Sequence, residues 1–140
     1  MSTLTKPILD NFLATKGYYI ILPEEAYDGG KVFLFKGKPG FREERSHHTT
    51  VSITKHPNCC GHKLIHSAQA STFQEYKYLI GGALLWCKLY NNACATYVTG
   101  SHQVSIIKAL EELGFKKVHE THNPKSNRLM ATWIINPSEL

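Results

Sequence analysis

The sequence predicts a mixed α/β domain, and three observations lead to that prediction. Strand-like segments follow one another through the first half of the chain. The second half alternates strand and amphipathic helix twice and then closes with a terminal hairpin. No linker or internal repeat interrupts the 140 residues. Because domains cluster at about 100–150 residues, we expect a single domain over residues 1–140.

The first half opens with a predicted helix, Pro7–Lys16, which has proline in its first turn and Gly17 as a terminator. Strands are predicted over Tyr18–Leu22 and Lys31–Lys36, where β-branched and aromatic residues predominate. The segment Gly37–Ser46 combines glycine, proline and four consecutive charged residues. This composition is typical of an exposed loop.

A third strand, His48–Lys55, and its partner, His62–Ser67, flank a turn rich in proline, asparagine and glycine. Ser71 or Thr72 is expected to cap the helix that follows, since Thr72 and Glu75 have the capping-box spacing. One face of that helix, which we expect to reach about Tyr90, carries an apolar stripe of Phe73, Tyr76, Ile80, Leu84 and Cys87.

Two adjacent glycines, Gly81 and Gly82, stand inside this helix. Glycine in a helix interior costs about 1 kcal/mol relative to alanine. We therefore expect them to permit a close approach by another part of the chain.

The remaining elements are a buried strand, Cys94–Thr99, and a last helix capped by Ser101 that ends at Gly114. Its expected buried face consists of Val104, Ile107, Leu110 and Gly114, with Ile106 and Leu113 beside it. Strands Lys116–Thr121 and Leu129–Ile135 then form a hairpin around a polar turn.

Composition narrows the class of protein. The apolar fraction of 42% suits a buried core, and the longest apolar stretch, Tyr78–Trp86, is too short to span a bilayer. The amino terminus lacks the features of a signal peptide. Of the four cysteines, two are adjacent and two lie in predicted core elements, which is not a disulfide framework, so we expect a cytoplasmic protein. A net charge of +5 suits anionic partners such as nucleic acid, a nucleotide cofactor or an acidic protein, and equally suits simple solubility.

A histidine and cysteine cluster between His56 and His66 has the ligand types that zinc selects, but not the usual spacing. Cys59 and Cys60 are adjacent, and no second ligand pair follows, so we expect no metal and no mutual disulfide. Cys59 or Cys60 beside a histidine could also form a nucleophilic pair, but the sequence does not identify the third residue that would orient the histidine. The sequence therefore assigns no catalytic residues. Nucleic-acid binding is left open by a possible stacking platform of Tyr18, Tyr19, Phe33 and Phe35.

Two strand-to-helix junctions, Ser67–Thr72 and Thr99–Gln103, place small and hydroxyl residues before a helix start. Unpaired N–H groups at such a start bind anions. If the two preceding strands are neighbours in one sheet, the junctions flank the same site.

The order of elements from Lys31 to Ile135, with the segment Leu113–Val118 as the best local match, resembles the GNAT superfamily of N-acetyltransferases. The resemblance implies acetyl-CoA as cofactor and an amine as acceptor. It places the CoA pyrophosphate and pantetheine arm near Gln69, Ala70, Ser71, Thr72 and Gln103.

The chain departs from the family at three positions. Thr72 replaces a glycine of the phosphate loop, Gln103 replaces an asparagine, and Leu110 replaces a tyrosine that often acts as general acid. No motif places the titratable groups His66, His102 and Glu75. The alternative is therefore a non-catalytic inhibitor or adaptor on the same scaffold, of a kind that phages and other mobile elements carry, directed at a host protein or nucleic acid.

Overall fold

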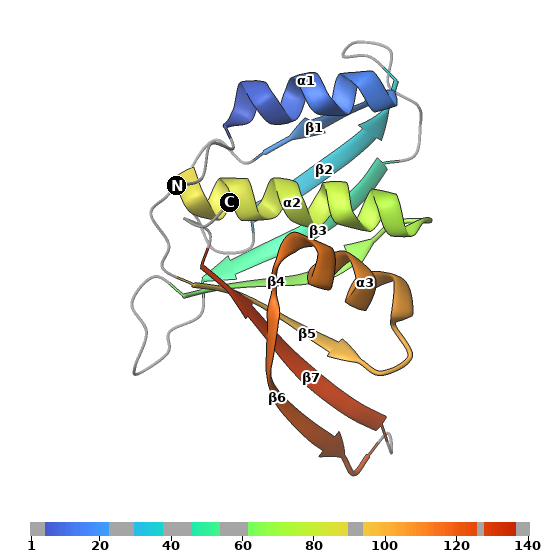
Figure 1. Cartoon of the computed structure of the whole chain (residues 1–140), viewed down its shortest axis with the longest axis vertical. Coiled ribbons are helices and arrows are strands. Elements are labelled where there is room, and N and C mark those ends of the chain that lie inside the picture. The colour runs from blue at the N-terminus through green and yellow to red at the C-terminus, as the bar shows by residue number, and fades with distance from the viewer. Residues whose placement is uncertain are drawn as a thin grey trace.

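The computed structural model describes residues 5–22, 30–37, 46–53, 62–89, 94–125 and 128–136. In this part of the chain, seven strands form one sheet and three helices lie along one face of it (Figure 1). The helices are α1 (Lys6–Lys16), α2 (Phe73–Leu89) and α3 (Val104–Leu113). The strands are β1 (Tyr18–Ile21), β2 (Gly30–Lys36), β3 (Ser46–Ile53), β4 (His62–Gln69), β5 (Cys94–Gly100), β6 (Lys116–Asn123) and β7 (Arg128–Ile135).

The strands lie in the order β1-β2-β3-β4-β5-β7-β6. All neighbouring pairs are antiparallel except β4 and β5, which are parallel and are connected through α2. The mixed sheet and the sequence of elements confirm the predicted fold class. The predicted loop Gly37–Ser46 and the turns around Cys59 and Gly29 lie mostly outside the described residues.

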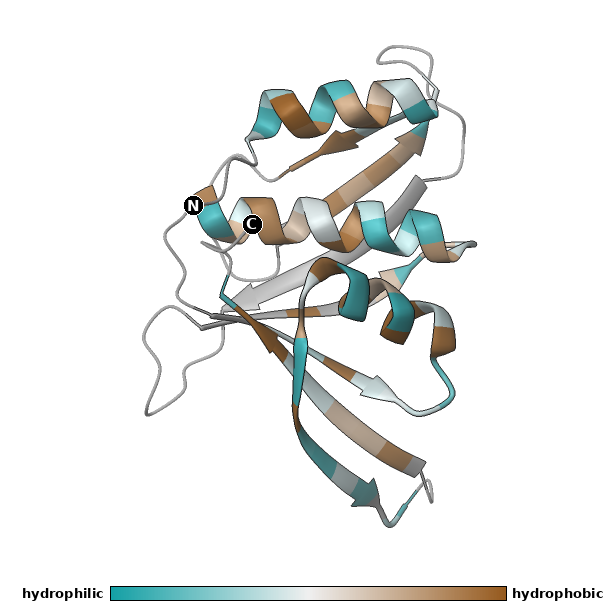
Figure 2. Ribbon diagram, viewed as in Figure 1, coloured by the Kyte–Doolittle hydropathy of each residue, from teal (hydrophilic) through white to brown (hydrophobic). Residues whose placement is uncertain are grey.

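Helix α2 is the centre of the hydrophobic core. Every residue from Leu79 to Cys87 is buried, because the helix lies on the sheet with α1 on one side and α3 on the other (Figures 1 and 2). Of the predicted stripe, Ile80, Leu84 and Cys87 are buried, whereas Phe73 and Tyr76 are half-buried. From Leu79 to Cys87, burial extends around the whole circumference of the helix. Among the described residues, no helix is long and apolar enough to cross a membrane.

The expected close approach at the two glycines occurs at Gly82. A Cβ atom there would lie 2.1 Å from Cδ1 of Ile20 and 3.6 Å from Cγ1 of Val32, so α2 rests directly on β1 and β2. A Cβ atom at Gly81 would meet only Cδ2 of Leu113, at 3.6 Å, which is an ordinary contact. The two glycines therefore differ, and only Gly82 is required by the packing.

Helix α3 differs from its prediction at its start and in its buried face. Gln103, not Ser101, is the N-cap residue, and its side chain makes no capping hydrogen bond. Val104 is 69% exposed, whereas the buried face consists of Ile106, Ala109 and Leu110. The prediction is confirmed for Leu110, and Ile107 and Leu113 pack against the core as partly buried residues. It is wrong for Val104, and the small residue Ala109 was not part of the predicted face.

The carboxyl end of α3 is a Schellman motif around Gly114. The Gly114 N–H donates to the Glu111 carbonyl and the Phe115 N–H to the Leu110 carbonyl, and Phe115 and Leu110 are both buried. Gly114 has φ of 99°, in the left-handed region. The sequence Leu113-Gly114-Phe115 thus ends the helix because Gly114 adopts the left-handed conformation.

Replacing Gly114 by valine is expected to lower the free energy of unfolding by about 1–2 kcal/mol through backbone strain. The nearest atom to an added Cβ is Cδ1 of Ile135 at 3.6 Å, so a clash is not the cause. Gly114→Asn is the control, because asparagine tolerates this conformation better. Urea denaturation curves compare the three proteins, and equal stability of all three would contradict the assigned helix end.

The predicted aromatic platform is divided between the two faces of the sheet. Tyr18 faces α2, whereas Tyr19, Phe33 and Phe35 share the opposite face. Their rings stack on one another, with centroid distances of 5.0 Å for Tyr19–Phe35 and 6.2 Å for Phe33–Phe35. Phe35 is only 7% exposed. These ring faces are therefore used for packing within the chain.

Candidate functional site

The candidate site lies where β4 and β5 separate. Their parallel pairing comprises His62–Cys94, Lys63–Ala95 and Leu64–Thr96 and goes no further. Strand β4 then continues to Gln69 and β5 to Gly100, and the two strands diverge toward the amino-terminal ends of α2 and α3 (Figure 1). The expectation that these strands are neighbours is confirmed, so both strand-to-helix junctions lie at the same edge of the sheet.

Strand β4 contains a β-bulge just before this edge. Thr50 pairs with His66 and His48 pairs with Gln69, so Ser67 and Ala68 together stand opposite Thr49. A bulge interrupts the hydrogen-bond ladder and redirects backbone groups. The bulge thus interrupts the pairing of β4 with β3 in the same part of β4 that no longer pairs with β5.

Tyr97 of β5 reaches across the divergence to this bulge. It is 4% exposed, lies opposite Trp133 in the β5–β7 pairing, and forms a hydrogen bond with the backbone of Ala68. Burial raises the pKa of Tyr97 to about 12, the Ala68 hydrogen bond opposes that rise, and Tyr76 adds to it.

The β5 side of the site is fixed by a buried hydrogen bond. Trp133 Nε1 donates to Thr99 Oγ1 at 2.9 Å, and Thr99 is fully buried. This bond satisfies both polar groups and holds β5 against β7. As a result, β5 keeps its pairing with β7 along the length where it leaves β4.

The amino terminus of α2 is capped by Thr72, as the capping-box spacing predicted. Thr72 Oγ1 accepts a hydrogen bond from the Glu75 N–H at 3.2 Å and donates one to Glu75 Oε1, also at 3.2 Å. Glu75 is 4% exposed and accepts a further bond from the Tyr18 hydroxyl at 2.9 Å. Burial, and then Glu75, raise the pKa of Tyr18 to about 12. Glu75 therefore ties α2 to β1.

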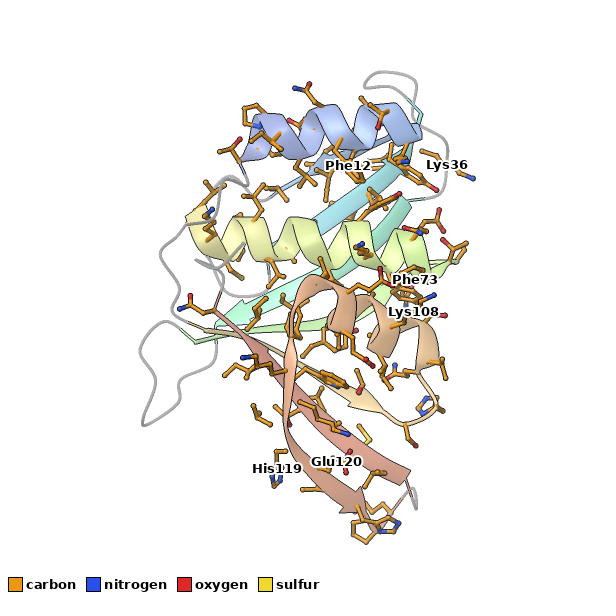
Figure 3. All side chains as sticks on the ribbon, in the orientation of Figure 1. Phe12, Lys36, Phe73, Lys108, His119 and Glu120 are labelled. Atoms are coloured by element: carbon orange, nitrogen blue, oxygen red, sulfur yellow. The ribbon has the colours of Figure 1, made fainter. Side chains whose placement is uncertain are left out.

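Besides the groups engaged with Glu75, the amino terminus of α2 has two backbone N–H groups and one neighbouring lysine side chain. The N–H groups of Phe73 and Gln74 have no acceptor within the part of the chain that the structure describes. Lys108 of α3 places its ammonium group 4.3 Å from the centroid of the Phe73 ring (Figure 3). A helix amino terminus and a neighbouring lysine together favour an anion.

The turn between β5 and α3 is held by Gln103. Its Oε1 accepts the Gly100 N–H at 2.8 Å, and its own N–H donates to the Gly100 carbonyl at 3.1 Å. A Cβ atom at Gly100 would lie 2.6 Å from Cε1 of His102, so that ring packs on the end of β5. Gln103 thus shapes the turn, and its side-chain oxygen is already engaged.

The residues predicted for cofactor binding gather at this edge. Gln69 is the last residue of β4 rather than part of the junction, because the strand runs two residues past the predicted end at Ser67. Ser71 and Thr72 are exposed and Ala70 is half-buried. Sequence reasoning missed Tyr97 and Lys108, since neither belongs to a motif.

The structure also bears on the other candidate residues. Among the described residues, no group of three or more histidine, cysteine, aspartate or glutamate side chains is placed to hold a metal ion. His56, Cys59 and Cys60 lie outside the described residues, so their predicted lack of a metal stays a prediction.

Neither a protein-family model nor a curated protein matches the sequence. Solved structures do match the fold. A Bacillus subtilis acetyltransferase in complex with CoA has a TM-score of 0.66 at 13% identity, over 85% of this chain and 98% of that one. The chain has the fold of the GNAT acetyltransferases.

Two further structures agree with this GNAT fold. A putative streptothricin acetyltransferase from Bacillus anthracis, in complex with acetyl coenzyme A, has a TM-score of 0.61 at 13% identity and matches 86% of this chain and 87% of that one. A chain of the NatC complex bound to Gag peptide and CoA has a TM-score of 0.64 at 12% identity, over 76% and 70% of the two chains. At sequence identities this low, the similarity supports only a shared fold.

Proposed function

We propose that this protein binds an acyl-CoA where β4 and β5 diverge and transfers the acyl group to an amine. The observation that carries the proposal is the shared position of three features at one edge of the sheet: unpaired strand backbone, a β-bulge and the start of α2. GNAT-fold structures determined with CoA or acetyl coenzyme A support the ligand class.

The pyrophosphate is proposed to bind over Gln69–Thr72. The open N–H groups of Phe73 and Gln74 and the ammonium group of Lys108 support this placement, because all three are attractive to a phosphate. Thr72 stands where a glycine would let the phosphate approach the backbone more closely, and its hydroxyl is engaged with Glu75. The phosphate would therefore rest on the first-turn N–H groups and not on the Thr72 side chain.

The acyl end is proposed to lie at the bulge, near the start of α3 and Gln103. In the reaction, the amine nitrogen forms a bond to the acyl carbon, the carbon–sulfur bond breaks, and the amine proton ends on the sulfur. Negative charge develops on the acyl oxygen, and a backbone N–H group of β4 at the bulge would stabilise it. A base that deprotonates the amine is not assigned to any described side chain.

Calorimetric titration of the full chain with acetyl-CoA tests binding, and release of free thiol in the presence of a panel of amines tests transfer. We expect saturable binding at one site per chain and thiol release that depends on the amine. No binding at millimolar acetyl-CoA would overturn the proposal. If acetyl-CoA binds but no amine causes thiol release, the proposed binding site stands and the proposed transfer reaction is wrong.

Lys108→Gln is expected to weaken acetyl-CoA binding by about two- to tenfold, because one charge-assisted phosphate contact is lost. The difference from the unmodified protein should shrink at high salt. Lys16→Gln is the matched control, since Lys16 of α1 also places its ammonium group over a phenylalanine ring, that of Phe12, at 5.9 Å from the centroid. Titrations at two salt concentrations compare the variants, and equal losses for both lysines would contradict a specific role for Lys108.

A non-catalytic binding protein on the same scaffold is the second candidate. The observation in its favour is Leu110, which stands at the position of the family's frequent general acid and is fully buried in the core. A thermal-shift comparison separates the candidates, because acetyl-CoA should raise the melting temperature only of a protein that binds it.

A further inference from the structure

The last residues of β5 lie level with the bulge of β4. The pairing of the two strands ends at Leu64 and Thr96, and four further residues along each strand lead to Ala68 and Gly100. Ser67 and Ala68 form the bulge, and Gly100 ends β5. An acyl group at the bulge would therefore have the carboxyl end of β5, and the turn into α3, across the divergence from it.

The His102 ring lies on this end of β5. A Cβ atom at Gly100 would be 2.6 Å from Cε1 and 2.7 Å from Nδ1 of His102, so the imidazole fills the space beside the glycine. Side chains alternate along a strand, and Tyr97 belongs to the core whereas Val98 is 44% exposed. Gly100 therefore faces the same way as Val98, and the His102 ring lies on the face of the sheet opposite the helices (Figure 1).

The turn that carries His102 is held by hydrogen bonds on both sides of it. The Ser101 N–H donates to the Leu129 carbonyl of β7 at 3.0 Å. Gln103 is bonded to Gly100 through its side chain and through its backbone N–H, at 2.8 Å and 3.1 Å. His102 is thus an exposed side chain on a backbone whose position is fixed.

The transfer reaction needs a base for the amine, and we propose that His102 is that base. This inference rests on the proposed function. The imidazole accepts the proton that the amine nitrogen loses as this nitrogen bonds to the acyl carbon. The carbon–sulfur bond breaks with its electron pair on the sulfur, and the imidazolium gives the proton to the sulfur. His102 returns to its starting form, and the products are an amide and free CoA.

The two substrates would then reach the acyl carbon from opposite faces of the sheet. The phosphates of acyl-CoA are proposed to rest on the first turn of α2, on the helix face, whereas His102 lies on the other face. The unpaired lengths of β4 and β5 connect the two faces. An amine beside the imidazole would therefore attack the acyl carbon without displacing the cofactor.

The other titratable groups near the site are less suited to this role. Glu75 is 4% exposed and is engaged with Thr72 and with the Tyr18 hydroxyl. Burial raises the pKa of Tyr97 to about 12, so this hydroxyl keeps its proton near neutral pH. His102 is exposed, and a hydrogen bond at one nitrogen of an imidazole is compatible with proton transfer at the other.

The test uses His102→Ala, acetyl-CoA and an amine that the unmodified protein acetylates. We expect the rate of thiol release at saturating substrates to fall on the order of 100-fold or more, with the affinity for acetyl-CoA within a few fold. Added imidazole should restore part of the rate, because it supplies the missing base in the space that the side chain leaves. His119→Ala is the matched control, since it removes another exposed histidine, on β6 (Figure 3), and should change neither quantity.

Gly100→Ala tests the position of the ring while the histidine is still present. The added methyl group would lie 2.6 Å from Cε1 of His102, so the ring must turn away from β5. Only the far end of a side chain has to move, so the melting temperature and the affinity for acetyl-CoA should stay unchanged. We expect the rate to fall by about tenfold or more. An unchanged rate would contradict a base held in place by contact with Gly100.

The outcomes separate this inference from the proposed function. If the unmodified protein acetylates an amine, but His102→Ala keeps its rate or loses it without rescue by imidazole, His102 is not the base and the proposed function stands. A loss found in His66→Ala and not in His102→Ala would assign the base to β4, just before the bulge, and overturn the inference. If the unmodified protein releases no thiol with any amine, the proposed transfer fails and the inference fails with it.

Discussion

Replacing Ala70 and Ser71 together by aspartate is expected to abolish acetyl-CoA binding while the fold stays intact. Two carboxylates would stand beside the first turn of α2, where the pyrophosphate is proposed to rest. Repulsion between these two carboxylates and the pyrophosphate should reduce binding to below what the titration detects. Negative charge before a helix amino terminus stabilises the helix, so the melting temperature should stay unchanged or rise slightly.

The matched control replaces the same two residues by asparagine, which has nearly the size of aspartate and no charge. We expect this double variant to bind acetyl-CoA within a few fold of the unmodified protein, measured by the same calorimetric titration. Ala70 is half-buried and Ser71 exposed, so both pairs of substitutions should be accommodated. Equal loss of binding in the two double variants would point to shape rather than charge and contradict a phosphate at this position.

The two glycines of α2 should respond in opposite directions to alanine. Gly82→Ala is expected to lower the free energy of unfolding by about 1–3 kcal/mol, because the added methyl group requires Ile20 to move and α2 to lift from the sheet. Gly81→Ala is expected to leave stability unchanged or raise it by up to about 1 kcal/mol, since it gains helix propensity at an ordinary contact distance.

Each variant is the control for the other, because the two positions share a helix, a burial class and a substitution. Chemical denaturation gives both free energies, and the difference between them is the quantity of interest. A stabilised Gly82→Ala protein would mean that α2 does not rest on Ile20. If both variants are destabilised equally, Gly81 must be in as close a contact with α3 as Gly82 is with the sheet.

Local patterns in the sequence determined most of the fold. The alternation of strands and helices predicted the mixed sheet, and the interior glycines correctly predicted a close approach at Gly82. Thr72 and Glu75 predicted the start of α2, because their hydrogen bonds lie within four residues of each other. Gly114 predicted the end of α3 for the same reason, since its left-handed conformation is a local requirement.

Long-range contacts explain what the sequence could not provide. Tyr97 and Ala68 belong to one buried cluster only because β4 and β5 are neighbours in the sheet, and Lys108 meets Phe73 only because α3 packs beside α2. The predicted cap of α3, Ser101, lies two residues before the observed N-cap, Gln103, whose side chain accepts a hydrogen bond from the Gly100 N–H and holds the turn. Fold and site region were thus accessible from local signals, while the polar groups inside the site depend on tertiary packing.

Amide resonances of the ¹⁵N-labelled full chain, recorded during titration with acetyl-CoA, test most directly whether the ligand binds where β4 and β5 diverge. Binding there should shift the signals of Ala68 and of the first turn of α2, from Ser71 to Gln74, more than those elsewhere. The hairpin of β6 and β7, whose tip extends beyond the helices, should be little affected (Figure 1). Shifts confined to that hairpin, or no shifts at millimolar acetyl-CoA, would contradict the proposed site.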